Sequence, residues 1–160
     1  MEMDINEIQV ACFMLGDDVY AVDIMRIKEI IRFSRLTNLP KSPDFIEGVF
    51  NLRGTVVPVI DLRKRFDVPP TPCGRDTRLL IVALEKQLAG LIVDDVMEVI
   101  SVPVKDLKPP PQVSEGIGAK YLIGVCLVKD SLIMLVNLDS IFSSNESCQL
   151  RRITETGLLP

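Results

Sequence analysis

The stretch EGVFNLRGTVVPVIDL, residues 47–62, sets two short apolar runs on either side of the pair Arg53-Gly54. Runs rich in β-branched residues are typical of strands, and a short connection that contains glycine is typical of a tight hairpin turn. An unpaired guanidinium is costly to bury, so Arg53 is predicted to lie at the surface of this hairpin. Pro58 cannot donate a ladder hydrogen bond, and its strand is therefore predicted to be an edge strand or to be bulged there.

The same hairpin pattern returns near the C-terminal end of the chain. Residues 48–66 align without gaps with residues 124–142, and Arg53 falls on Lys129. The apolar positions of the second strand coincide almost throughout. A second hairpin with a cation at its turn is therefore predicted.

A second pair of blocks repeats in the same order. Residues 13–31 align with residues 82–100, which places Glu29 on Glu98. Agreement over two successive blocks indicates a duplicated unit. Ten short apolar runs, separated by clusters of Gly, Pro and Asp, are too many for one small barrel and fit two. The sequence therefore predicts an all-β chain built from two similar lobes.

The composition excludes several classes of function. The chain contains no histidine, which removes histidine-based acid–base catalysis, histidine metal ligation and phosphohistidine transfer. Its net charge of −4 argues against nucleic-acid binding, because phosphate neutralisation needs a basic face. The four cysteines show no CxxC pair and are predicted to be reduced thiols rather than a disulfide or zinc framework. We expect no metal and no cofactor.

The N-terminal residues lack the basic start and apolar core of a secretory signal. The longest purely apolar run, residues 79–84, is too short to cross a bilayer. No direct membrane insertion is expected.

Around the motif NLRG, residues 51–54, the chain resembles the CheW family of chemotaxis coupling proteins. The resemblance extends to about Phe142 and rests on an ordered series rather than on one motif. The matching stretches are FMLGDDVYAVDI, the IKEI that follows it, LPKSPDFIEGVFNLRGTVVPVIDLRKRF, GLIVDDVMEVI and YLIGVCLVKDSLIMLVNLDSIF.

This resemblance implies a fold of two intertwined five-stranded SH3-like β-barrel subdomains with a shared core and a few short helical turns. We expect one CheW-like domain over residues 1–142. Its lobes are expected at about residues 13–78 and 79–142, with strands exchanged between them. The tail, residues 143–160, is expected to be a short helix or mobile.

The resemblance also implies a non-catalytic adaptor. Such proteins couple chemoreceptors, the methyl-accepting chemotaxis proteins, to the chemotaxis histidine kinase in bacterial signalling arrays. The implied partners are the cytoplasmic tip of the receptor and the regulatory domain of the kinase. The implied location is the cytoplasm, at receptor arrays beneath the inner membrane.

Five residues match family positions linked to receptor binding. Asn51, Arg53 and Gly54 belong to the NLRG motif, whereas Ile27 and Glu29 belong to the IKEI element. A guanidinium can fork onto a partner's carboxylate or carbonyl, which fixes the register of the partner. Each residue also has a structural interpretation. Arg53 can be a solvated turn residue, and Glu29 can pair with Arg53 or with another cation of the protein. Ile27 can be a core residue, and Asn51 can satisfy backbone groups at the hairpin end.

Three other functions fit parts of the sequence. The first is a small-ligand-binding β-barrel without a signalling partner, although Leu, Ile and Val side chains are predicted to fill both barrels. The second is an enzyme that uses Asp94 and Asp95, but neighbours in a strand point to opposite faces. The third is a detached regulatory domain of the kinase. With 160 residues, the chain is expected to be a standalone coupler.

Overall fold

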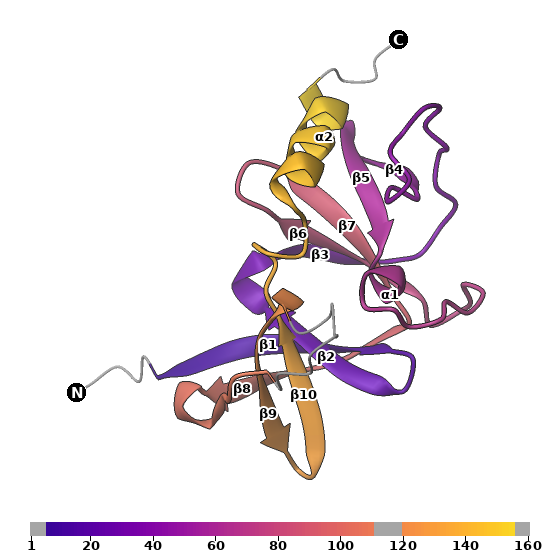
Figure 1. Ribbon diagram of the computed structural model, residues 1–160. Helices are drawn as coiled ribbons and strands as arrows, with labels where there is room; N and C mark the ends of the chain where they lie inside the picture. The colour runs from indigo at the N-terminus through magenta and orange to yellow at the C-terminus, as the bar shows by residue number, and fades with distance from the viewer. Residues whose placement is uncertain (1–5, 111–119, 156–160) are drawn as a thin grey trace.

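The computed structural model describes residues 6–110 and 120–155, which form two five-stranded sheets (Figure 1). The strands are β1 (Glu7–Leu15), β2 (Asp18–Asp23), β3 (Ile27–Arg32), β4 (Gly48–Leu52), β5 (Thr55–Asp61), β6 (Arg78–Ala83), β7 (Leu88–Val93), β8 (Asp95–Pro103), β9 (Leu122–Val128) and β10 (Ser131–Val136). The helical pieces are η1 (Ile24–Arg26), α1 (Leu62–Arg65), η2 (Val104–Asp106) and α2 (Ser144–Glu155). The predicted all-β class with a few short helical turns is confirmed. Among the described helices, none is long and apolar enough to cross a membrane.

Both sheets have the same strand order, and each is built from both sequence repeats. The orders are β8-β1-β2-β10-β9, here lobe A, and β3-β6-β7-β5-β4, here lobe B. The repeat aligns β1 to β5 with β6 to β10, so each repeat places its first two strands in the sheet of the other. The exchanged strands join through the parallel pairs β2–β10 and β5–β7. The two lobes are therefore intertwined, as the family resemblance implies.

Each lobe has a filled apolar interior. In lobe A the buried residues are Val10, Cys12, Ala21, Val102, Cys126, Ile133 and Leu135. In lobe B they are Val57, Val59, Leu79, Ile81 and Ile92. The interior of each lobe is thus filled by side chains from the strands of that lobe.

A larger cluster, here called the shared core, joins the lobes. It combines Phe13, Leu15 and Val22 of lobe A with Ile60, Leu80 and Leu91 of lobe B, all almost fully buried. Leu79 and Ile81 of β6 point into lobe B, whereas the intervening Leu80 points into the shared core, because successive strand residues face opposite sides. Burial on both faces explains why this strand reads as an unbroken apolar run.

Both predicted hairpins are present, with two-residue turns. Arg53 and Gly54 have φ of 48° and 92°, and Lys129 and Asp130 have φ of 50° and 68°. Positive φ at both central residues defines the type I′ turn, whose twist suits a β-hairpin.

The prediction of an edge or bulged strand at Pro58 is wrong. Its strand β5 lies between β7 and β4, and Pro58 is in regular register with Val49. The pairing of β5 with β7 begins only at Val59. Proline is tolerated because the ladder to β7 has not yet started at its nitrogen.

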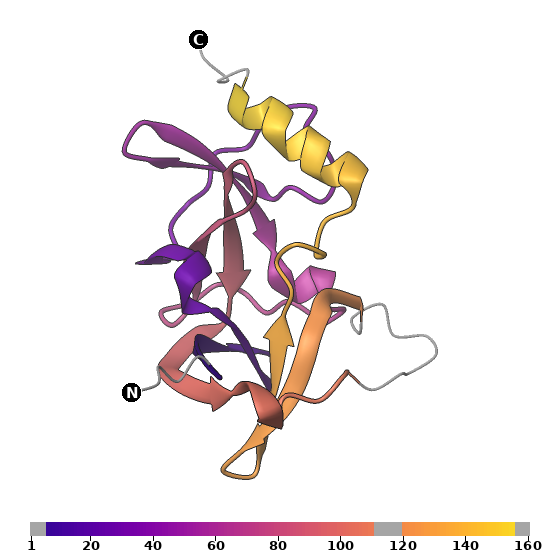
Figure 2. The same cartoon turned by 90° about the vertical axis from the view of Figure 1, so that its left-hand side faces the viewer.

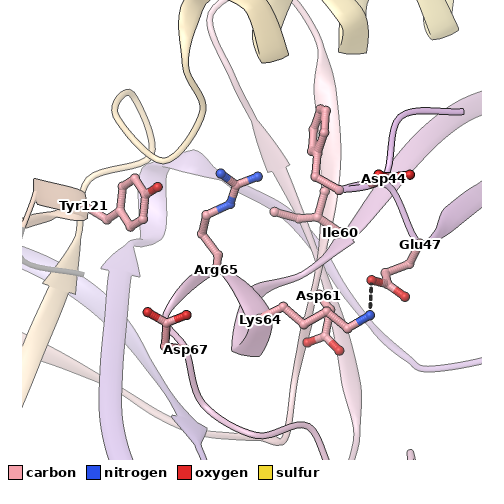
Figure 3. Close-up of a pocket in the computed structure, with 9 residues that line it drawn as sticks. Asp44, Glu47, Ile60, Asp61, Lys64, Arg65, Asp67 and Tyr121 are labelled. Atoms are coloured by element: carbon pink, nitrogen blue, oxygen red, sulfur yellow. Dashed lines mark hydrogen bonds and ion pairs between the residues drawn. The ribbon is translucent and has the colours of Figure 1, made fainter. Parts of the chain in front are cut away.

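Helix α2 extends the shared core over lobe B through the buried side chains of Leu150 and Ile153. Arg65 of α1 anchors the start of this helix, with its Nη1 3.1 Å from Glu146 Oε1. Three aromatic rings surround the same guanidinium, with centroids 5.3 to 5.9 Å away: Phe45, Tyr121 and Phe142. Arg65 forms part of the wall of an open pocket of about 400 Å³ (Figure 3). A cation enclosed by aromatic faces thus joins α2 to both lobes.

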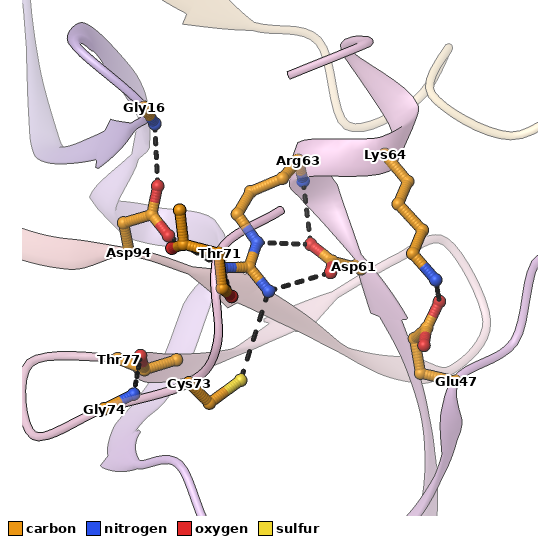
Figure 4. Close-up of polar contacts among 10 residues, drawn as sticks. All are labelled: Gly16, Glu47, Asp61, Arg63, Lys64, Thr71, Cys73, Gly74, Thr77 and Asp94. Atoms are coloured by element: carbon orange, nitrogen blue, oxygen red, sulfur yellow. Dashed lines mark hydrogen bonds and ion pairs between the residues drawn. The ribbon is translucent and has the colours of Figure 1, made fainter. Parts of the chain in front are cut away.

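Arg63, also in α1, connects the lobes through buried charges (Figure 4). Its Nε and Nη2 donate to Asp61 at 2.8 and 2.9 Å, and its Nη1 donates to Asp94 at 2.8 Å. The second oxygen of Asp94 accepts the N–H of Gly16, in the β1–β2 turn of lobe A, at 2.7 Å. Nη1 also donates to the carbonyl of Thr71 at 2.9 Å. The guanidinium and its carboxylates therefore satisfy one another at the junction of the lobes.

Replacing Arg63 by alanine is expected to destabilise the fold strongly. The change would leave Asp61, whose side chain is only 5% exposed, without its counter-charge. We expect the free energy of unfolding to fall by about 3–5 kcal/mol, measured by urea denaturation. Lys64→Ala is the matched control, because the Lys64 side chain is more than half exposed and its pair with Glu47 contributes at most about 1 kcal/mol. Similar losses of unfolding free energy in both variants would contradict the role of Arg63 in holding the two lobes together.

The cysteines are expected to differ sharply in reactivity. All four are free thiols; Cys12 and Cys126 are buried, and Cys73 is exposed. Burial, with smaller contributions from Glu98 and Cys126, raises the pKa of Cys12 to about 11, so its thiol stays protonated at pH 8. Alkylation with iodoacetamide, followed by peptide mass spectrometry, should modify Cys73 first and reach Cys12 only after unfolding. Equal native rates for these two would show that lobe A opens readily.

Candidate protein-binding face

The predicted site residues lie where the two outer strands of lobe B approach each other. Strands β3 and β4 are the two ends of the lobe B sheet order. Glu29 comes from β3, and Arg53 follows the last residue of β4. Their side chains meet, with Arg53 Nη2 3.0 Å from Glu29 Oε2. The ion pair therefore spans the seam of the barrel, where the described residues form no ladder between the two outer strands.

Both residues of this ion pair keep hydrogen-bonding atoms that the pair itself does not use. Among the described residues, the buried Oε1 of Glu29 has no hydrogen-bond partner. The Arg53 side chain is 73% exposed, so most of its donors face water. An exposed pair of this kind contributes at most about 1 kcal/mol to stability. Its arrangement suits a guanidinium that is oriented by one carboxylate and still open to a second acceptor.

Asn51 and Gly54 shape the turn that presents Arg53. Asn51 Oδ1 accepts the backbone N–H of Gly54 at 2.7 Å, as turn asparagines often do. Gly54 has the φ of 92° that a side chain would strain, although the space around its α-carbon is open. Arg53 itself has φ of 48°, a left-handed conformation that costs a non-glycine residue about 1 kcal/mol or more.

Ile27 has a different environment from the other four. It is partly buried, packs against the shared core and faces Val82 in the β3–β6 register. The register shifts between Ile27 and Glu29, which marks an irregularity at this end of β3. Such bulges re-aim the side chains that follow them. Ile27 thus fixes β3 to the core, while Glu29 reaches the seam.

Four apolar side chains of η1, β3 and β8 are exposed, and the sequence patterns did not single them out. Met25 of η1 is 84% exposed and Ile30 of β3 is 42% exposed. Met97 and Val99 of β8 are 51% and 50% exposed. In Figure 2 η1 lies above β8, and Figure 1 shows that β1 runs between them. Met97 and Val99 are near neighbours in β8, and neighbouring exposed apolar side chains are typical of surfaces that contact other molecules.

The alternative of an enzyme that uses Asp94 and Asp95 has a poor structural basis. Asp94, one of its two proposed groups, is committed to Arg63 and to the backbone of Gly16. Asp95 begins β8 and forms no described ion pair or hydrogen bond through its side chain. The two neighbours therefore do not form a shared acid–base site.

Comparisons with known proteins agree with this architecture. The model of the CheW-like domain matches residues 9–146. The chemotaxis protein CheW of Treponema pallidum is 34% identical over 157 residues, which cover 96% of this chain and 92% of the relative. Protein FrzA of Myxococcus xanthus is 36% identical over 114 residues, 71% of each chain.

A solved structure is similar over nearly the whole chain. The crystal structure of the scaffolding protein TtCheW from Thermoanaerobacter tengcongensis matches with a TM-score of 0.80 and 35% sequence identity. The match covers 91% of this chain and 92% of that chain. Duplicated and exchanged strands, the NLRG turn and this extent of similarity lead to one assignment: the chain belongs to the CheW family.

Proposed function

We propose that this protein is a non-catalytic adaptor that couples chemoreceptors to the chemotaxis histidine kinase of a bacterial signalling array. Its relatives are named as chemotaxis proteins, and the solved relative is described as a scaffolding protein. The observation that carries the proposal is the open Glu29–Arg53 ion pair at the seam of lobe B, with the buried Oε1 of Glu29 unsatisfied among the described residues.

The cytoplasmic tip of a chemoreceptor is the proposed occupant of this face. Such a tip is a helical hairpin, and a helix docks through apolar side chains ringed by a few charges. Ile30 of β3 supplies exposed apolar surface in lobe B, and Met97 and Val99 of β8 supply exposed apolar surface in lobe A. Arg53 supplies a guanidinium that can fork onto a carboxylate or a carbonyl of the helix end.

The remaining predicted site residues support that contact. Asn51 and Gly54 hold the turn in the conformation that projects Arg53. Glu29 orients the guanidinium, and Ile27 anchors the strand that carries Glu29. Receptor binding would therefore use two kinds of residue, those that touch the helix and those that position them.

The regulatory domain of the kinase is the second proposed partner, because it resembles this family in fold and can meet a lobe of similar shape. We place the protein in the cytoplasm at receptor arrays beneath the inner membrane, where both partners are present. The role needs no cofactor and no bond-making chemistry. The alternative of a small-ligand barrel has less support, since buried side chains fill the interiors of both lobes.

Arg53→Ala is expected to leave the fold intact and to weaken receptor binding. The side chain is mostly exposed, so the free energy of unfolding should change by less than about 1 kcal/mol. Affinity for a purified receptor-tip fragment, measured by calorimetry, should fall about five- to thirtyfold, and receptor-stimulated kinase activity should fall with it. Lys129→Ala, at the equivalent turn of lobe A, is the matched control and should bind normally. Unchanged receptor affinity for Arg53→Ala would refute the proposed contact.

Glu29→Gln is expected to act through Arg53. The variant keeps the side-chain size but removes the charge that orients the guanidinium at 3.0 Å. Receptor affinity should drop in the single variant and should drop no further when Glu29→Gln is added to Arg53→Ala, because the two residues act as one unit. Independent, additive losses would mean that Glu29 contacts the receptor by itself. Loss of the folded circular dichroism spectrum would mean that its role is structural.

A further inference from the structure

Two arginines face each other across the β3–β6 ladder of lobe B. Arg32 and Arg78 are direct partners in the antiparallel register. Direct partners lie on the same sheet face with their Cβ atoms about 5 Å apart, and like charges at such positions destabilise a sheet. The chain therefore keeps a repulsive pair at an edge strand, although its net charge of −4 gives it a surplus of carboxylates.

No described carboxylate neutralises this pair. The Nη1 of Arg78 donates to the carbonyls of Arg75 and Thr77, at 2.8 and 3.1 Å. The exposed Arg32 forms no ion pair or hydrogen bond through its side chain within the described residues. Asp76, in the adjoining turn, is exposed and makes no ion pair in that part of the chain either. The remaining donors of both guanidinium groups are thus open to an external acceptor.

The turn that carries Arg75 is held firmly against β3. The N–H of Gly74 donates to Thr77 Oγ1 at 2.8 Å, and Thr77 is a buried polar residue. The N–H of Phe33 donates to the carbonyl of Thr77 at 3.1 Å, which extends the ladder beyond β3. Arg75 itself is exposed. Arg32 therefore lies on one segment, and Arg75 and Arg78 on a second segment that is hydrogen-bonded to the first.

We propose that Arg32, Arg75 and Arg78, here called the arginine cluster, bind a short carboxylate-rich segment of a protein partner. Guanidinium groups pair with carboxylates through two parallel hydrogen bonds, and a fixed cluster selects for acidic groups spaced along a peptide. A nucleic acid is a poor occupant, because a polyphosphate needs an extended basic face and this protein is acidic as a whole. The inference is independent of the receptor contact at Arg53.

A titration with a hexaglutamate peptide, followed by NMR of the ¹⁵N-labelled protein, tests the proposal. We expect peptide-dependent shifts at the amides of Phe33 and Thr77, which become smaller as salt is added. Arg32→Ser should weaken peptide affinity about two- to fivefold and leave the Tm unchanged or higher, because one of two like charges is removed. Lys86→Ser, in the β6–β7 turn, is the control: it changes the net charge equally and should leave peptide affinity as in the unaltered protein.

Three results would overturn the proposal. Equal affinities for Arg32→Ser and Lys86→Ser would mean that the peptide senses only net charge. A lower Tm for Arg32→Ser would mean that Arg32 has a structural role. The same shifts with inorganic phosphate at equal concentration would assign the cluster to phosphate rather than to an acidic segment.

Discussion

The exchange of strands between the two sheets determines how both lobes of this protein fold and pack. Because β1 and β2 complete the sheet of β8, β9 and β10, neither sheet can form from one repeat alone. The exchange also places both faces of the central strands against apolar neighbours, one inside a lobe and one in the shared core. The two lobes therefore behave as a single platform, and the Arg63 network and the Arg65 cage add polar and aromatic contacts at the same junction.

A platform of this kind leaves its outer strands available for other molecules. Open sheet edges invite unwanted pairing, and natural proteins protect them with charges, bulges and short covering segments. Lobe B combines these devices: Thr37 forms an isolated bridge to Val49 of β4, and the Glu29–Arg53 ion pair spans the seam toward β3. Lobe A has an equivalent isolated bridge, between Lys108 and Val125 of β9. The charged groups that protect a sheet edge from unwanted pairing also determine the surface chemistry of that edge.

The sequence was sufficient for the architecture because the repeat and the turn residues are local signals. The hairpin at Arg53 and its counterpart at Lys129 follow from short patterns, and both were found with positive φ. The prediction at Pro58 was wrong because the missing backbone N–H does not show how far the ladder between β5 and β7 extends. The exposed Ile30 and Met97 could not be recognised, since apolar runs look alike in strands buried on both faces and in strands with one open face. Exposure depends on pairings between distant segments.

Comparison of the two repeats shows where they have diverged. The repeat places Glu98 and Lys129 of lobe A at the positions of Glu29 and Arg53, with a similar turn. Yet in the described part of the chain Glu98 and Lys129 form no ion pair, whereas their lobe B counterparts meet at 3.0 Å. Identical strand order with different seams means that backbone pairing alone does not require the ion pair. Lobe B has the Glu29–Arg53 ion pair, and lobe A folds without an equivalent pair among the described residues. The ion pair is therefore better explained by binding than by folding.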